Sequence, residues 1–239
     1  MSPRKKMLLL VVLLPAAALL ALVMLLKCPP LAYHRTGAIL QDPAARQEAL
    51  RRFDEDVVNR FGDVAFDQSG RTRLNVTVTE DMVNARLRQY LDEADRNGER
   101  VPHELATLRV AFEPGCMVLA ARIGRGATSV VAAQEIRLAA TETGLLKVEL
   151  GALQAGWLPI PRAVADQWRA GLRKMASRPE KAGDEGGADD LWRAVFEAMD
   201  QGPVPLGKGK RQIVLEKIEI ERGSLHIEGH KATKRAAPR

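Results

Sequence analysis

The N-terminal apolar run constrains the architecture of this chain more than any other feature. From Met7 to Leu26 the sequence carries no charged side chain and no strongly polar one. A helix over such a stretch rises about 1.5 Å per residue, and it would reach about 30 Å, the thickness of the hydrocarbon core of a bilayer. The run therefore predicts a transmembrane anchor at 7–26, followed by a domain built from the remaining residues.

A cleaved signal peptide is the alternative interpretation of the same run. Such a signal needs an apolar core of about 7–15 residues and a small-residue cleavage site, which Ala16–Ala18 would supply. The run continues to Leu26, beyond what a processed signal needs, and this favours the uncleaved anchor. A lipoprotein signal does not fit, because Lys27 precedes Cys28 where a small residue is required.

Basic residues flank the apolar run unevenly. Arg4–Lys6 precede it, whereas only Lys27 follows directly and the next basic residue is Arg35. The positive-inside rule then places the N-terminus in the cytoplasm. We expect a single-pass signal-anchor protein of the cell inner membrane, with residues 1–6 as a cytoplasmic tip, 27–42 as a stalk and the C-terminal domain periplasmic or otherwise extracytoplasmic.

A first amphipathic helix is expected directly after the stalk. Asp42 suits its N-cap and Pro43 its first helical position. Apolar residues then recur every three or four positions as far as Gly62, which would end the helix. The apolar stripe that needs a partner consists of Leu50, Phe53, Val57, Val58 and Phe61.

The hydrophobic period changes to two in the next segment. Residues 74–78 alternate between apolar and polar and predict a half-buried strand. Thr79 suits the N-cap of a second helix, and the acidic residues at 80–81 would interact favourably with the dipole of its first turn. Asn97–Gly98 would end that helix.

From 105 to 153 helix signals give way to strands separated by turns. Pro114–Gly115 and Thr143–Gly144 mark turns between alternating apolar runs. This pattern predicts a four-stranded antiparallel meander. Long strands with alanine and glycine on one face favour a strongly curved sheet.

The stretch "LGALQAGWLPIP" at 150–161 forms a corner at the end of the meander. Gly156 lets the chain turn, while Pro159 and Pro161 prevent the strand and the helix from continuing through the corner. A helix would begin at Pro161. The predicted fold class is α+β, an N-terminal transmembrane helix followed by a curved antiparallel sheet wrapped around a long helix. The apolar stripe of that long helix would be Val164, Trp168, Leu172 and Met175.

The C-terminal part of the chain completes one domain spanning 43–229. Residues 178–188 are polar, glycine-rich and without period, and they predict a flexible insertion. A short helix at 189–200 would follow. The chain then predicts a hairpin that turns at Arg222–Gly223, with a β-bulge between Leu215 and Ile218, and a disordered basic tail at 230–239.

Several functional classes lack support in the sequence. Cys28 and Cys116 are expected to be unpaired, because Cys28 would be held beside the membrane and a disulfide needs Cα atoms within about 7 Å. The four histidines show no metal-ligand spacing, so no metal is expected. Aromatic residues make up 4% of the chain and form no basic face with interleaved rings, so nucleic acid is not an expected partner. Catalytic and nucleotide-binding motifs are absent, and neither an enzyme nor a cofactor is predicted.

Three sequence segments and their order resemble a known family. After an N-terminal anchor come "LNVTVTEDMVNARL", "VELGALQAGWLPIPRAVADQW" and a final "IEIERGSLHIEG". Over most of 50–229 this order resembles the YpmS-like bacterial envelope proteins, which in turn resemble tubular lipid-binding half-barrel domains. The resemblance implies a curved sheet around a long helix, with an apolar groove able to hold an acyl chain.

The functional hypothesis is therefore a membrane-anchored, non-enzymatic domain that binds a lipid or another apolar ligand. Its partners would be the membrane bilayer, the lipid ligand and an envelope protein. The same apolar residues also fit an ordinary packed core, without a ligand. The residues assigned to the groove are Trp157, Leu158, Val164 and Trp168.

A scaffold that docks an envelope protein, with no ligand, is the competing hypothesis. The docking surface would be a sheet edge or the helix at 189–200. In that case the large apolar side chains of the helix would be exposed rather than buried, namely Trp192, Phe196 and Met199.

Overall fold

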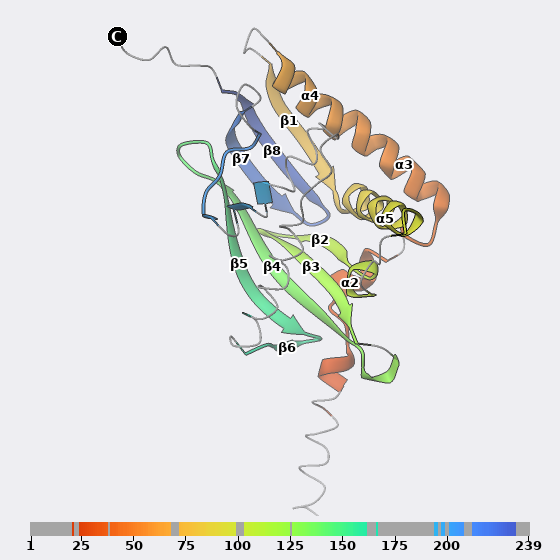
Figure 1. Cartoon of the computed structure of the whole chain (residues 1–239). Helices are drawn as coiled ribbons and strands as arrows, with labels where there is room; N and C mark the ends of the chain where they lie inside the picture. Colours follow the sequence, from red (N-terminus) through yellow and green to blue (C-terminus); the bar gives the residue numbers. More distant parts are fainter. Residues whose placement is uncertain are drawn as a thin grey trace, which may run out of the picture.

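The structure, a computed structural model, contains two antiparallel sheets with helices packed beside them (Figure 1). One sheet has three strands in the order β1-β8-β7, and the other has five in the order β2-β3-β4-β5-β6. The residues that the structure describes are 21, 24–37, 39–67, 72–98, 103–124, 126–161, 166, 194–195, 197–198, 201–207 and 212–232.

The transmembrane anchor predicted at 7–26 is wrong. Among the described residues, no helix combines the length and the apolar character needed to cross a bilayer. Of the predicted span the structure describes Ala21 and Met24–Leu26, and there the Trp157 N–H donates to the Leu25 C=O at 3.0 Å. Hydropathy records how apolar a run is, and it does not distinguish contact with lipid from contact with protein. The predicted single-pass inner-membrane location and the predicted extracytoplasmic placement of the domain both depended on this anchor. Both predictions are therefore wrong for the same reason.

The first helical region covers the three-stranded sheet (Figure 1). It consists of α3 (Pro43–Phe53), a π-helical turn η1 (Asp54–Val58) and α4 (Asn59–Phe66), which follow one another without a break. As predicted, the Asp42 carboxylate caps the start by accepting from the N–H groups of Ala44 and Ala45 at 2.9 and 3.2 Å.

The predicted end of this helix at Gly62 is wrong, because α4 continues to Phe66. A glycine inside a helix costs about 1 kcal/mol relative to alanine. Phe61 and Val64, on either side of Gly62, are both buried in the core, and their burial offsets that cost.

The three-stranded sheet pairs segments from both ends of the described chain. β1 (Arg73–Thr79) pairs with β8 (Ser224–Lys231), and β8 pairs with β7 (Ile213–Glu221). The predicted hairpin turn is present at Gly223, whose φ is 87°. The predicted bulge is confirmed by a register shift between Leu215 and Lys217.

Helix α5 (Glu80–Arg96) links the two sheets. Its predicted N-cap is confirmed, since the Thr79 hydroxyl accepts from the Met82 N–H at 3.3 Å. It packs against α3, and its buried residues Met82 and Val83 lie in the main core.

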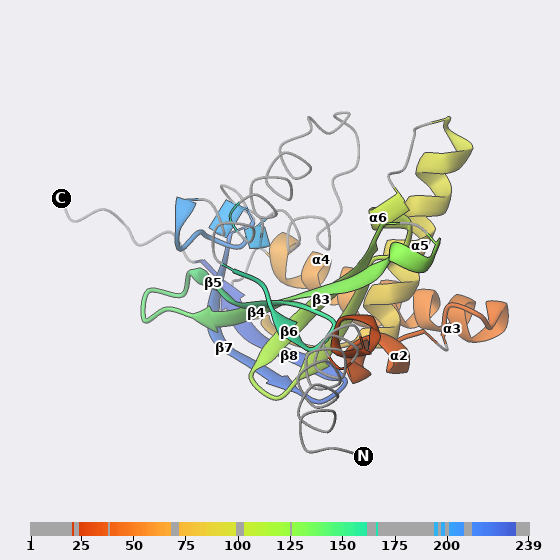
Figure 2. The same cartoon turned by 90° about the horizontal axis from the view of Figure 1, so that it is seen from below.

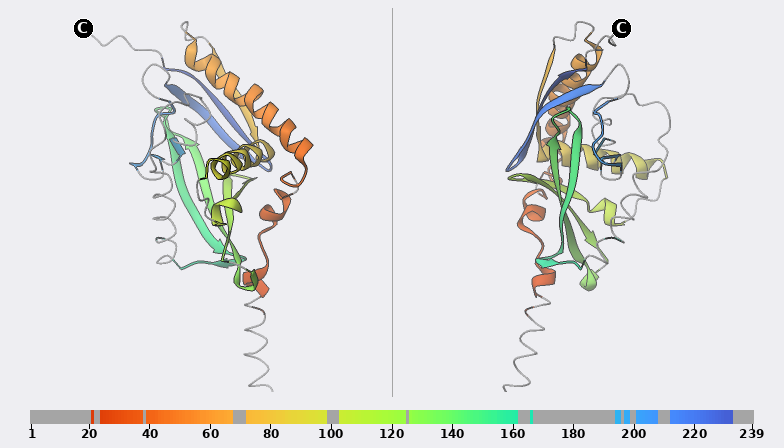
Figure 3. Two further views of the ribbon diagram at one scale, coloured as in Figure 1. Left: turned by 45° about the vertical axis from the view of Figure 1, so that its right-hand side comes forward. Right: turned by 90° about the vertical axis from the view of Figure 1, so that its left-hand side faces the viewer.

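The second sheet is the predicted antiparallel meander, extended by a short strand. Its strands pair in chain order, and β4 and β5 curve along their length (Figure 3). Two short helical turns, α6 (His103–Ala106) and η2 (Gly126–Thr128), flank it. The strands are β2 (Arg109–Glu113), β3 (Cys116–Ile123), β4 (Val130–Ala140), β5 (Leu146–Ala155) and β6 (Leu158–Pro159).

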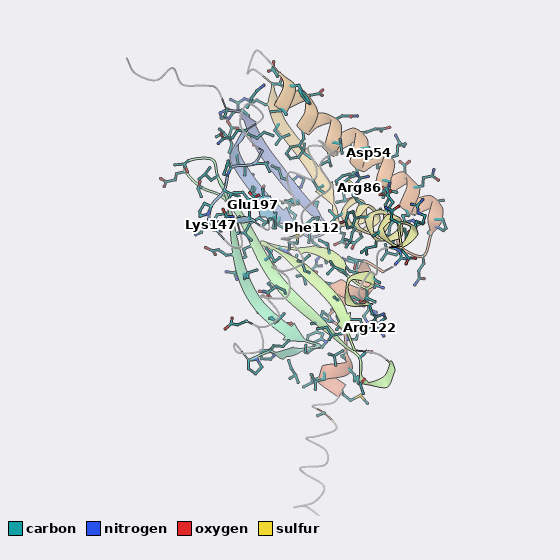
Figure 4. The ribbon with its side chains drawn as sticks, viewed as in Figure 1. Asp54, Arg86, Phe112, Arg122, Lys147 and Glu197 are labelled. Carbon is teal, nitrogen blue, oxygen red and sulfur yellow. The ribbon has the colours of Figure 1, made fainter. Side chains whose placement is uncertain are left out.

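Strand β7 joins the two sheets by crossing the turns of the meander. The Gly115 N–H donates to the Ile220 C=O at 2.9 Å, and the Leu215 N–H donates to the Gly144 C=O at 2.9 Å. Phe112, which is 0% exposed, lies where β2 meets this junction (Figure 4). Both sheets, α3 to α4 and α5 therefore share one hydrophobic core.

The predicted fold class is wrong in how the helices and sheets are arranged. The domain is α+β, but two sheets share the core in place of one sheet wrapped around a long helix. The long helix predicted from Pro161 falls on residues that, except for Asp166, lie outside the described part of the chain. The same holds for the predicted insertion at 178–188 and, for the greater part, for the predicted helix at 189–200 and the tail at 230–239.

A second, smaller core lies on the opposite side of the meander. Helix α2 (Leu31–Arg35), within the segment predicted as a stalk, lies on that side (Figure 2). Its Ala32 and Tyr33 pack into this core. The Arg109 guanidinium stacks over the Tyr33 ring at 4.1 Å and donates to the Tyr33 C=O at 2.6 Å. We call this side of the sheet the outer face, and its residues are Ala111, Val118, Ala120, Val131 and Ala133.

Candidate functional site

The four residues predicted to line a groove are not all described. Trp157 is 55% exposed at the corner between β5 and β6, and Leu158 beside it is half-buried. Val164 and Trp168 lie outside the described residues, as do Trp192, Phe196 and Met199 of the docking hypothesis. The groove proposed from these four residues therefore stays a prediction.

The Gly156–Trp157 corner packs against the segment that follows the apolar run. Gly156 has a φ of 59°, and a Cβ atom on it would collide with the backbone carbonyl oxygens of Leu25 and Leu26. Glycine is needed here both for its conformation and for this close approach. The conspicuous motif at 150–161 thus positions the chain rather than presenting reactive groups.

The described residue with the least satisfied polar group is Gln134, in the middle of β4. It is 1% exposed, and it pairs with Leu119 of β3 and Leu153 of β5. We call this side of the five-stranded sheet the inner face. Because side chains alternate along strands and the pairing is known, the part of this face around Gln134 includes Leu119, Ala121, Ala132, Leu153 and Ala155, and Met117 and Ile136 continue it towards the main core.

A β-bulge in β5 fixes the amide of Gln134. Between the pairs that Gln134 and Ile136 make with β5, the register shifts, so that Gly151 and Ala152 together oppose Glu135. The Gln134 Nε2 lies 2.8 Å from the Glu135 C=O, 3.1 Å from the Gly151 C=O and 3.3 Å from the Ala152 C=O. The amide nitrogen thereby satisfies carbonyl groups that the bulge removes from the regular ladder.

The amide oxygen of Gln134, Oε1, makes no comparable hydrogen bond within the described part of the chain. Among the described residues, no donor lies within hydrogen-bond distance of Oε1, although this oxygen is buried. Native proteins seldom leave a buried polar atom without a partner, and each case needs an explanation. Sequence reasoning did not select Gln134, because a single glutamine within a strand of alanine and valine carries no motif.

A second polar cluster, by contrast, is fully paired. The Arg35 guanidinium binds Glu80, Glu113 and the Phe112 C=O at distances of 2.8–3.1 Å. Its hydrogen bond and charge interaction with Glu80 raise the pKa of Arg35. Burial, followed by the nearby Glu80, raises the pKa of Asp81. Because both carboxylates that Arg35 contacts are engaged in ion pairs with it, the cluster anchors α2 to α5.

Cys28 and Cys116 are both free cysteines in the structure. Burial, together with the charges of Glu135 and Glu113, raises the pKa of the Cys116 thiol, which opposes a nucleophilic role. Within the described ranges, no group of three or more histidine, cysteine, aspartate or glutamate side chains is placed to hold a metal ion.

Comparison with protein-family models, with curated proteins and with solved structures found no match. The resemblance to YpmS-like envelope proteins drawn from the sequence therefore stays a prediction.

Proposed function

We propose that this protein binds an apolar ligand, a lipid or a molecule of similar character, on the inner face of its five-stranded sheet, and that it catalyses no reaction there. Two features of the face support this proposal. One is its row of small apolar side chains, and the other is the unpaired amide oxygen of Gln134 among them.

The small residues form a continuous row across three strands. Ala121 of β3 pairs with Ala132 of β4, which pairs with Ala155 of β5. Alanine is depleted in strands because its methyl group contributes little packing between neighbours. Further along the same face, Met117 and Ile136 fill the main core with large side chains. The alanine row occupies less volume above the sheet than such residues would.

Alanines on the outer face have a different explanation. There Ala120 and Ala133 lie under Ala32 and Tyr33 of α2, and small side chains let the helix approach the sheet closely. The inner row differs because it borders the row that contains Gln134, whose buried acceptor has no partner among the described residues. This buried acceptor among apolar groups is the observation that carries the proposal.

Apolar burial would supply most of the affinity for such a ligand. Each Å² of apolar surface removed from water contributes about 25 cal/mol, so an alkyl chain needs no charged residue to hold it. Ligand sites are commonly apolar with few polar groups that fix orientation. Leu119, Leu153 and the alanines match the apolar part of that description, and Gln134 matches the polar part.

Binding of the hydrocarbon dye diphenylhexatriene to the full chain tests the proposal, because the dye fluoresces when it leaves water. We expect saturable binding that Ala132→Leu weakens by at least about fivefold, since added methylenes in a filled site cost about 1–3 kcal/mol. Ala133→Leu is the matched control, because the next residue of the same strand faces the outer side. Both variants retain the N-terminal apolar run, so dye bound to that run contributes equally.

Thermal melts of both variants establish that they are folded before binding is compared. Absence of saturable dye binding to the unaltered chain would overturn the proposal. Equal loss of binding in folded Ala132→Leu and Ala133→Leu would also overturn it, because the loss would then not depend on the inner face.

A further inference from the structure

The bulge determines which way the Gln134 amide points. Its nitrogen carries two hydrogens and no acceptor site, and it lies within 3.3 Å of the carbonyl oxygens of Glu135, Gly151 and Ala152. The reversed amide would place Oε1 against three carbonyl oxygens, an arrangement without a single hydrogen bond. The oxygen is therefore held on the side of the amide away from the bulge.

The bulge is itself fixed from the other side of the sheet. Glu135 Oε2 accepts from the Ala152 N–H at 3.4 Å. A Cβ atom on Gly151 would lie 2.9 Å from the Glu135 side chain, so glycine is needed at the bulged position. With both faces constrained, Gln134 has little freedom to rotate its oxygen towards another partner.

The described surroundings of the oxygen offer it no donor. The described positions of the inner face next to Gln134 all carry side chains without a hydrogen-bond donor, and they are Met117, Leu119, Ala121, Ala132, Ile136, Leu153 and Ala155. A lone water molecule fits poorly here, because buried water needs two to four polar partners. A ligand with a hydrogen-bond donor on a hydrocarbon body would satisfy the oxygen. The same hydrocarbon body would pack against the apolar neighbours.

We propose that Gln134 Oε1 accepts a hydrogen bond from a hydroxyl or N–H group of the bound ligand, and that the ligand is therefore an uncharged amphiphile with a donor on its apolar body. This inference rests on the proposed function and narrows the class of ligand. A long-chain alcohol, an acylglycerol with a free hydroxyl or a fatty amide belongs to the class. A fatty-acid carboxylate does not, because it has no donor and the inner face described above has no cation to pair with its charge.

Competition between two isomeric ligands distinguishes hydrogen bonding to Gln134 from apolar binding alone. Undecan-1-ol and decyl methyl ether have the same atoms, but only the alcohol donates a hydrogen bond. Water hydrates the alcohol more strongly, so a site without an acceptor prefers the ether. We expect undecan-1-ol to displace diphenylhexatriene from the full chain at a concentration at least about fivefold lower than the ether requires, and undecanoate to displace it more weakly than either.

Gln134→Met removes the acceptor while retaining the approximate side-chain volume. The preference for the alcohol over the ether should then disappear or reverse. This ratio is compared within one variant, so a general loosening of the bulge affects both isomers alike. Gln154→Met is the matched control, since Gln154 lies on the same sheet and pairs with Ala133, a residue of the outer face. It should keep the preference of the unaltered chain.

The outcomes distinguish this inference from the proposed function. If the dye binds but the two isomers displace it equally, or the ether displaces it better, Gln134 does not select a donor, and apolar binding stands alone. A preference that persists in Gln134→Met would also overturn the inference. If the dye does not bind, the proposed function fails and the inference with it. Should Gln134→Met fail to fold, the two isomers on the unaltered chain still decide.

Discussion

Glu80 holds Arg35 through two parallel hydrogen bonds, from Nε to Oε1 at 2.8 Å and from Nη2 to Oε2 at 2.9 Å. The pair joins α2 to the first turn of α5, across a sequence separation of 45 residues. Only 11% of the Glu80 side chain is exposed, against 35% of that of Arg35. The contact therefore fastens an N-terminal segment onto the domain through a charge that is largely removed from water.

Replacing Arg35 by methionine should destabilise the domain. Removing one partner of a buried pair leaves the other charge uncompensated, at a cost of 3–5 kcal/mol for full burial. Because Arg35 is one-third exposed, we expect about 1–2 kcal/mol. Arg35→Lys should restore little of this, since an ammonium cannot make the bidentate contact.

Urea unfolding measures the effect of Arg35→Met, with Arg51→Met as the control. Arg51 pairs with Glu48 and Glu55 on an exposed helix surface, where removal should cost less than about 1 kcal/mol. Equal destabilisation by the two variants would contradict a special role for the Arg35–Glu80 pair.

Asn84 should stabilise the free edge of β2. Its side chain accepts from the Val110 N–H at 2.8 Å and donates to the Val110 C=O at 2.6 Å, which takes the place of a neighbouring strand. Asn84→Leu would leave both backbone groups buried without partners, and we expect a loss of about 2–4 kcal/mol in the free energy of unfolding. Amide hydrogen exchange at Val110 should accelerate accordingly.

The control for Asn84→Leu is Asn75→Leu, which removes an exposed asparagine from β1. This change should stay within about 0.5 kcal/mol of the unaltered chain, as is usual for surface positions. A similar loss in both variants would show that the edge contact contributes little.

Gly156→Ala should cost more than Gly98→Ala. Both glycines have positive φ, 59° and 76°, so alanine strains the backbone at each by about 1 kcal/mol. A Cβ at Gly98 meets nothing within 4 Å, whereas at Gly156 it collides with the carbonyls of residues 25 and 26. Thermal unfolding should show a larger loss of stability for Gly156→Ala than for Gly98→Ala. The difference should disappear in a chain that begins at residue 28, because the carbonyls of residues 25 and 26 are then absent.

Glu48 should make the stability of the domain depend slightly on pH in the acid range, since exposed ion pairs contribute little. Hydrogen bonds from Arg51, then from Arg52, lower the pKa of this carboxylate from 4.5 to about 2. A lowered folded-state pKa gives stability that is present above the unfolded value and lost as the pH falls towards the folded one. The stability difference between the unaltered chain and Glu48→Gln should therefore be largest above about pH 5 and be mostly lost as the pH falls through about 2. A difference that is constant from pH 6 to pH 2 would contradict this assignment.

Alkylation should distinguish the two thiols. Cys28 is exposed, while Cys116 is half-buried and its pKa is raised by burial and by the nearby carboxylates of Glu135 and Glu113. The thiolate is the reactive form, so iodoacetamide at pH 8 should modify Cys28 several times faster, as followed by peptide mass spectrometry. Urea should make the two rates similar.

Local signals in the sequence predicted much of the secondary structure. Asp42 and Thr79 cap the helices that they were expected to cap, and the bulge after Leu215 is where the hydrophobic phase changes. Each of these features depends on side chains within a few residues of one another, so the sequence alone contains the necessary information. The apolar run at 7–26 was misread because its composition, also a local property, does not determine what it contacts.

The contacts between distant segments were decided only by the tertiary structure. The Gln134 amide contacts three carbonyl groups only because the bulge at Gly151 places them beside it. Asn84 binds the edge of β2 only because α5 packs next to that strand. Gly62, which locally favours the end of a helix, stays helical because burial of its neighbours outweighs its propensity. Local signals in the sequence determined most of the helices, strands and turns, but neither the continuation of α4 past Gly62 nor helix α2. Which of them meet, and which polar atom is left without a partner, depended on packing free energies that sum over residues far apart in the chain.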